Sequence, residues 1–126
     1  MAQKSTIDIQ ERTFKFGIQI IKFVDKLPRT LAGTEPGRQL IRSGTSIAAN
    51  MEETNGAESK SDFIHKVSIA YKEARETRLW LGLIKAAILA DAVEVDKLYA
   101  ERDELVRILF AILRTARSAT RRSPSH

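Results

Sequence analysis

The chain has 126 residues, of which 43% are hydrophobic and 29% charged, with six glycines, three prolines and no cysteine. This composition is typical of one globular domain and excludes an intrinsically disordered chain, which would lack the apolar residues needed for a core. The lack of cysteine excludes disulfides and thiolate metal sites, and His65 and His126 are too few for a histidine-built metal site.

The net charge of +5 is concentrated at one end of the chain. Residues 1–105 hold 16 basic and 16 acidic residues, whereas residues 106–126 hold five arginines and no acid. The N-terminus shows no signal-peptide core. The longest apolar run, residues 79–90, is interrupted by Lys85 and is shorter than the roughly 20 residues of a membrane-spanning helix. We therefore expect a cytoplasmic protein.

Residues 1–9 are predicted to be a flexible lead-in, and the first helix is predicted over residues 10–27, where Pro28 ends it. Its apolar residues cover more than half of the helical wheel, which is wider than one neighbouring helix needs. The second helix is predicted from about Thr34, its N-cap, to Thr54, after a loop over residues 28–37 with turns at Gly33 and Gly37. Its small residues allow a neighbouring backbone to approach closely.

The third helix is predicted to start after Ser59 or Ser61 as N-cap and to continue to about Ala90. Its second half is apolar on all sides, although a helix in a four-helix bundle leaves one face outward. This segment therefore predicts a subunit interface. The candidate interface residues are Leu79, Trp80, Leu83 and Ala87.

The fourth helix is predicted over residues 93–119, after a turn in which Asp91 and Glu94 resemble a capping box. Residues 120–126 are predicted to be a basic, flexible tail. Four helices with short connections fold most simply as an all-α, antiparallel up-down-up-down bundle. We expect this bundle to occupy residues 10–119 and to be oligomeric.

The second helix carries the pattern R-x-x-x-S-I-x-x-N-x-x-E at residues 42–53, followed by Ser59-Lys60, Phe63 and Ala74-Arg75-Glu76. Over about residues 10–118 the chain thereby resembles the bacterial four-helix-bundle family of proteins encoded in intervening sequences of 23S ribosomal RNA genes, the S23-like proteins. The resemblance implies an antiparallel left-handed bundle in a ring, usually a homopentamer, with no established enzymatic activity. A distantly similar bundle, the accessory protein of diversity-generating retroelements, is a basic pentamer that binds reverse transcriptase and nucleic acid.

Polar residues recur on one face of the second helix at spacings of three and four. They are Ser43, Ser46, Asn50 and Glu53. One interpretation is a binding face, or a carboxylate partnered by Glu76 or Arg75 across the bundle. The other is a hydrogen-bonded seam that sets helix register or subunit orientation.

The sequence contains no motif of an active site. A di-iron site would need two Glu-x-x-His pairs on different helices, whereas the chain has one Asp62-x-x-His65. Phosphate-loop, HExxH and GxSxG patterns are also missing. We therefore expect no enzymatic activity, no metal and no cofactor.

The arginines of the fourth helix are the main functional lead. The predicted nucleic-acid-binding residues are Arg107, Phe110, Arg114, Arg117, Arg121 and Arg122. Arginine binds phosphate oxygens and an adjacent aromatic ring can stack on a base, so a ring of such faces could hold RNA or DNA. Cations near a helix C-terminus also complement the helix dipole and can simply be solvated. The alternative function is therefore a protein–protein adaptor whose arginines only keep it soluble.

Overall fold

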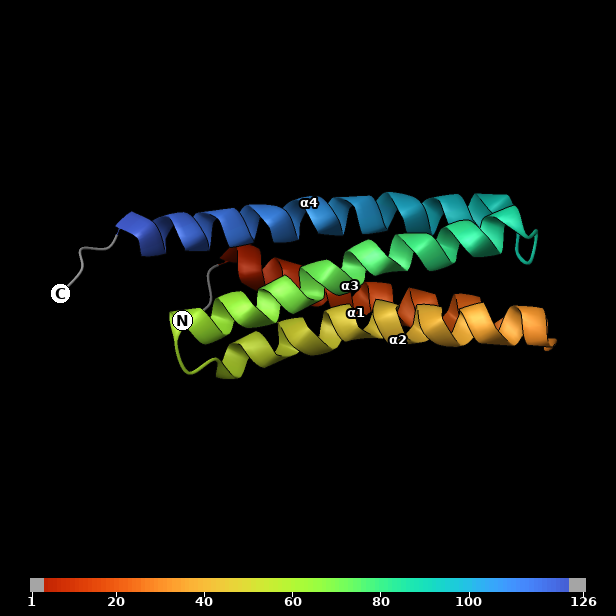
Figure 1. Cartoon of the computed structure of the whole chain (residues 1–126), viewed down its shortest axis with the longest axis horizontal. Helices are drawn as coiled ribbons and strands as arrows, with labels where there is room; N and C mark the ends of the chain where they lie inside the picture. Colours follow the sequence, from red (N-terminus) through yellow and green to blue (C-terminus); the bar gives the residue numbers. More distant parts are fainter. Residues whose placement is uncertain (1–3, 123–126) are drawn as a thin grey trace.

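Four α-helices lie side by side as an elongated bundle in the computed structural model (Figure 1). The structure describes residues 4–122, and the side chains of residues 8–119. The elements are α1 (Lys4–Asp25), α2 (Leu31–Glu53), the short 3₁₀ helix η1 (Thr54–Gly56), α3 (Lys60–Ala86) and α4 (Ala92–Arg122). Residues 4–122 contain no strand. The prediction of an all-α chain with four helices is thus confirmed.

Helices that follow one another in the chain are also neighbours in space, and α1 packs against α4 as well. Gln10 near the start of α1 donates a hydrogen bond of 3.0 Å to the Met51 carbonyl oxygen near the end of α2. Arg12 of α1 pairs with Glu101 of α4 at 2.7 Å. Because the backbones of α1 and α3 do not approach each other closely in the described residues, these two helices occupy diagonally opposite corners of the bundle.

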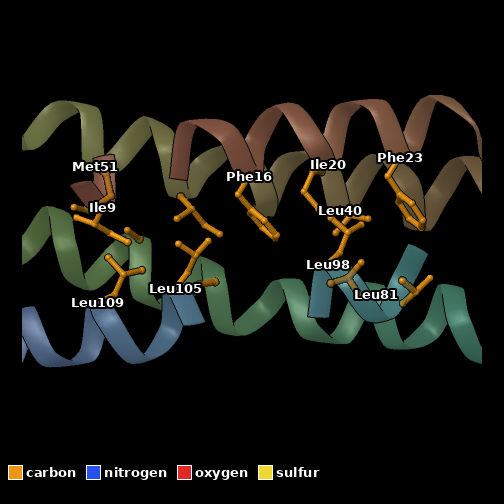
Figure 2. Close-up of a cluster of buried hydrophobic side chains, with 14 of the residues drawn as sticks. Ile9, Phe16, Ile20, Phe23, Leu40, Met51, Leu81, Leu98, Leu105 and Leu109 are labelled. Carbon is orange, nitrogen blue, oxygen red and sulfur yellow. The ribbon is translucent and has the colours of Figure 1, made fainter. Parts of the chain in front are cut away.

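Apolar side chains from all four helices meet along the middle of the bundle (Figure 2). Burying each large side chain contributes about 1.5–3 kcal/mol, so this column supplies most of the driving force for folding. Its labelled members are Ile9, Phe16, Ile20, Phe23, Leu40, Met51, Leu81, Leu98, Leu105 and Leu109.

The predicted lead-in and tail are both shorter than expected. Helix α1 begins at Lys4, because Ile9 packs into the core at 1% exposure and draws the preceding turn into the helix. Helix α4 continues to Arg122, past the predicted end at residue 119. The rest of the predicted lead-in and tail, residues 1–3 and 123–126, lies outside the described residues.

The predicted loop over residues 28–37 is mostly helical, and α2 starts three residues before the predicted N-cap Thr34. Thr30 is the N-cap instead, and its hydroxyl accepts a hydrogen bond of 3.3 Å from the Gly33 backbone N–H. A Cβ atom at Gly33 would lie 2.2 Å from the Pro28 carbonyl oxygen. Gly33 therefore allows the chain to fold back tightly between α1 and α2, within the helix rather than in a turn.

Helix α3 ends at Ala86, four residues before the predicted end. Ile88 adopts a left-handed backbone conformation with φ of 56°. The Leu89 N–H donates to the Ile84 carbonyl oxygen, and the Ile88 N–H donates to the Lys85 carbonyl oxygen, both at 3.0 Å. This is a Schellman motif, which usually has glycine at the left-handed position. With isoleucine there, the apolar run gave no signal that the helix stops.

Candidate nucleic-acid interface

Helix α4 presents the predicted binding residues Arg107, Phe110, Arg114 and Arg117 to solvent. Phe110 is 49% exposed, which is unusual for a large aromatic side chain that has a core nearby. The other two predicted residues, Arg121 and Arg122, belong to the last turn of α4, but their side chains lie outside the described residues.

Two aromatic rings meet across the boundary between α3 and α4, and a cation lies beside each of them. The Arg114 guanidinium lies 6.0 Å from the centroid of the Phe110 ring. The Phe110 ring lies 6.0 Å from the Tyr71 ring, and the Arg75 guanidinium lies 5.8 Å from the Tyr71 ring. We call Arg75, Tyr71, Phe110 and Arg114 the cation–aromatic row. The sequence predicted the two α4 members, but it could not show that Tyr71 and Arg75 of α3 lie beside them.

The arginines of this surface differ in how far their charge is compensated. Arg107 pairs with Glu104, and this hydrogen bond lowers the pKa of the Glu104 carboxyl and raises the pKa of Arg107. None of the ion pairs formed by residues 8–119 involves Arg75, Arg114 or Arg117. The cation–aromatic row therefore keeps uncompensated positive charge beside the exposed Phe110 ring and the partly buried Tyr71 ring.

An open groove of about 590 Å³ runs between α3 and α4 and shares Arg75 with the cation–aromatic row. A Cβ atom at Gly82 would lie 2.7 Å from the Tyr99 hydroxyl oxygen, so glycine leaves room for Tyr99 to lie against α3. The lining residues are Arg75, Arg78, Leu79, Gly82, Leu83, Tyr99, Arg102 and Val106. The side chains of this groove thus include three arginines and no acid.

Arg102 occupies a core-facing position of α4 and is only 8% exposed. Its guanidinium pairs with Asp103 and donates a hydrogen bond of 3.4 Å to the Ala74 carbonyl oxygen. Its Nε atom is buried and has no hydrogen-bond partner. Arg102 was not among the residues predicted from the sequence, although its spacing from Leu98 and Leu105 matches the core positions of α4.

The predicted subunit interface is partly exposed in the single chain. Leu79 and Leu83 are 54% and 47% exposed, and Ala87 is exposed as well. Trp80 instead packs partly buried against the core, and its indole N–H donates to Glu76 at 3.0 Å. The outward apolar surface of α3 is therefore formed by the two leucines rather than by Trp80.

The polar residues of α2 find partners within the chain. Ser43 is fully buried, and its hydroxyl oxygen lies 3.0 Å from that of Thr77 on α3. The Asn50 side chain donates to the Ser46 carbonyl oxygen at 2.8 Å. The Ser43–Thr77 contact favours the interpretation of the stripe as a seam between α2 and α3, whereas the Asn50 bond stays within α2.

Glu53 of the stripe and Glu76, its possible partner on α3, lie in separate ion pairs. Glu53 accepts a hydrogen bond of 2.8 Å from Lys66, rather than pairing with Arg75. Glu76 pairs with Arg42, whose guanidinium also lies 3.2 Å from Glu73. The stripe therefore does not converge on one site.

Residues 8–119 contain no cluster of three or more His, Cys, Asp or Glu side chains that could bind a metal ion. Among the helices described, none has the length and hydropathy needed to cross a lipid bilayer.

The fold and these surfaces define a class of protein: a small, all-α chain of four helices with an exposed cation–aromatic surface. The sequence profile of the 23S rRNA-intervening sequence protein family matches residues 5–111, and the chain belongs to this family. A crystal structure from Bacteroides thetaiotaomicron VPI-5482, described as a protein with unknown function from the S23 ribosomal protein family, is similar. It shares 29% identity, with coverage of 87% of this chain and 98% of that chain and a TM-score of 0.82. No curated protein matches the chain. The predicted family resemblance is thus confirmed.

Proposed function

We propose that the chain is an antiparallel up-down-up-down bundle that assembles into a homo-oligomeric ring and binds RNA or DNA without enzymatic activity. Five copies is the number that the family resemblance implies. The observation that carries the proposal is the cation–aromatic row of Arg75, Tyr71, Phe110 and Arg114.

The row supplies both kinds of contact that a nucleic acid needs. Guanidinium groups without an acidic partner can bind phosphate oxygens, and each phosphate that is neutralised releases counterions. Exposed rings such as Phe110 offer a surface on which unpaired bases stack, worth about 1–3 kcal/mol per base. Because each ring lies about 6 Å from a guanidinium, one strand can contact both at once.

The assembly part of the proposal is supported by apolar side chains that the single chain leaves in water. Besides Leu79 and Leu83 on α3, helix α1 exposes Phe14 by 62%, Ile18 by 40% and Ile21 by 49%. Contiguous exposed apolar patches of this kind mark interaction sites, since leaving them in water is unfavourable.

A salt titration of RNA binding tests the nucleic-acid part. We expect the logarithm of the affinity of a labelled single strand to fall linearly with the logarithm of salt concentration between about 50 and 200 mM. In the double variant Arg114→Gln and Arg117→Gln the slope should become shallower by about 1.4, because each phosphate contact contributes roughly 0.7. Fluorescence anisotropy measures both quantities.

The matched control removes the same charge elsewhere. Arg29 and Arg38 are exposed and lie away from the cation–aromatic row, so Arg29→Gln with Arg38→Gln should leave the slope unchanged. Phe110→Leu should weaken single-strand binding without changing the slope, because it removes stacking but no charge. If the wild-type protein binds no RNA or DNA at low salt, this function is wrong and the protein–protein adaptor becomes the better explanation.

A further inference from the structure

We infer that the outward face of α3, with the groove beside it, binds the outward face of α1 from a second copy of the chain. This inference rests on the proposed assembly and specifies which two surfaces form it. It follows from two rows of exposed residues that each combine an apolar stretch with charges of opposite sign, acids on α1 and bases on α3. Because Arg75 belongs both to the α3 row and to the cation–aromatic row, such a contact leaves Phe110 and Arg114 of α4 to bind nucleic acid.

The first row lies on α1 and has acids at both ends of an apolar centre. Its members are Glu11, Phe14, Ile18, Ile21 and Asp25. Spacings of three and four place all five on one side of the helix, and all five are exposed. This side faces away from the core, which is formed by residues such as Phe16 and Ile20.

The second row lies on α3 and combines bases with apolar residues. Its members are Lys72, Arg75, Leu79, Leu83 and Ala86. They too recur at spacings of three and four, and all five are exposed. Three row members, Arg75, Leu79 and Leu83, also line the groove between α3 and α4.

The groove adds hydrogen-bond donors that lack an acceptor. The buried Nε atom of Arg102 has no partner, and Arg75 and Arg78 form no ion pair within the described residues. The Arg102 Nε is enclosed by its own chain, whereas Arg75 and Arg78 are exposed and open to an acceptor from outside. An acid at one end of the α1 row can face this basic end of the α3 row, so a second copy can supply a carboxylate that the groove's own side chains do not.

The acids of the α1 row can leave their partners within the chain and pair with bases of a second copy. Glu11 lies 3.3 Å from Lys15 and Asp25 lies 3.4 Å from Arg29, both in exposed pairs along the same helix. Exposed pairs of this kind contribute only about 0–1 kcal/mol, so replacing them with contacts to arginines costs little.

The position of the two rows determines the type of assembly. Helices α1 and α3 lie at opposite corners of the bundle, so each copy would use two different surfaces on opposite sides. Such heterologous contacts produce a ring when the rotation between copies closes. Two α1 rows facing each other would place acid against acid in either orientation, which disfavours a twofold contact through α1.

Complementation between two variants tests the inference. Ile18→Asp disrupts the α1 row and leaves the α3 row intact, whereas Leu79→Asp does the opposite. We expect each variant alone to be monomeric in analytical ultracentrifugation. An equimolar mixture should form a particle of twice the 14.2 kDa mass of one chain, because only one intact contact can form per pair.

Chemical cross-linking gives a second, independent readout. The chain has no cysteine, so Ile18→Cys and Leu79→Cys each introduce a single thiol. Each thiol is placed in a chain whose other row is disrupted, giving Ile18→Cys with Leu79→Asp, and Leu79→Cys with Ile18→Asp. A short bis-maleimide reagent should join these two proteins when they are mixed. Each protein alone should stay uncross-linked. Leu31→Asp is the control, because Leu31 is 79% exposed but belongs to neither row.

Distinct results separate the possible failures. If either Asp variant keeps the wild-type size, or the mixture neither dimerises nor cross-links, the assignment of these surfaces is wrong while the ring can still form elsewhere. If Leu79→Asp keeps its size but loses RNA binding, the α3 face binds nucleic acid and the inference is wrong. A monomeric wild-type protein would contradict the proposed assembly itself. Circular dichroism verifies that all variants remain helical.

Discussion

Gly44 illustrates how one residue sets the distance between two helices. A Cβ atom there would lie 2.9 Å from Ile20 Cγ1 and 3.0 Å from Ile20 Cγ2, and Ile20 is fully buried. A β-branched side chain in a helix has little freedom to move aside. We expect Gly44→Ala to lower the free energy of unfolding by about 1–3 kcal/mol, measured by urea denaturation.

Gly56 is the matched control for this substitution. A Cβ atom at Gly56 would meet nothing within 4 Å, and its φ is not positive. Gly56→Ala should therefore change stability by no more than about 0.5 kcal/mol, or raise it slightly. Equal effects of the two substitutions would show that helix propensity, rather than close packing at Ile20, determines the result.

Ile88 is a residue whose backbone conformation suits glycine better. Its φ of 56° places a β-branched residue in the left-handed region, and its side chain is 85% exposed, so little packing is lost on its removal. We expect Ile88→Gly to raise the free energy of unfolding by about 1 kcal/mol, because the left-handed conformation costs an L-residue roughly 1–2 kcal/mol. Urea or thermal denaturation measures the change.

The opposite result is expected two residues earlier. Ala86 ends α3 in regular helical geometry, so Ala86→Gly should destabilise the chain by up to about 1 kcal/mol. A loss of stability in both variants would contradict the left-handed assignment of Ile88.

At the scale of an element, the start of α3 depends on one serine out of two. Ser59 is the N-cap, and its hydroxyl accepts a hydrogen bond of 3.0 Å from the Asp62 backbone N–H. The sequence alone could not choose between Ser59 and Ser61. Ser59→Ala should cost about 1 kcal/mol of stability, whereas Ser61→Ala, inside the first turn, should cost less than about 0.5 kcal/mol. The reverse order in denaturation experiments would place the cap at Ser61.

At the scale of the whole molecule, the proposed assembly couples stability to protein concentration. A protein that folds and associates gains stability by mass action, so its Tm rises as the protomer concentration increases. In Leu83→Asp we expect a monomer whose Tm no longer depends on concentration, because a charge would be buried at the contact. Calorimetry over a hundredfold range of concentration, alongside light scattering, checks this. A wild-type Tm that does not vary would count against assembly.

Trp80 is less suitable than Leu83 for this purpose. It packs against the core and donates to Glu76, so Trp80→Asp would disturb the fold of the single chain as well as any contact between copies. Leu83 is 47% exposed, so its replacement leaves the core intact.

Much of the fold could be predicted from periodicity, because the spacing of apolar residues reports which side of a helix is buried. The number of helices and the basic side of α4 followed from this local information, and the family followed from the motifs within residues 42–76. The ends of the helices did not. Ile9 extends α1 through burial in a core that the sequence could not assemble, and Ile88 ends α3 without the usual glycine. Helix α2 has two threonines that could be its N-cap, and the bond from the Gly33 N–H identifies Thr30 rather than Thr34.

The candidate surfaces, like the fold, could be predicted from the sequence only in part. The sequence by itself determined that Phe110 and Arg114 share one side of α4, since residues four apart on a helix are neighbours. Only the tertiary structure decided that Tyr71 and Arg75 continue that surface, and that Arg102 is buried with an unpaired Nε. The physical reason is that spacing along one helix reports directions around its own axis. Contacts between helices also depend on how the helices are rotated and offset against each other, and that is settled by packing of the whole core.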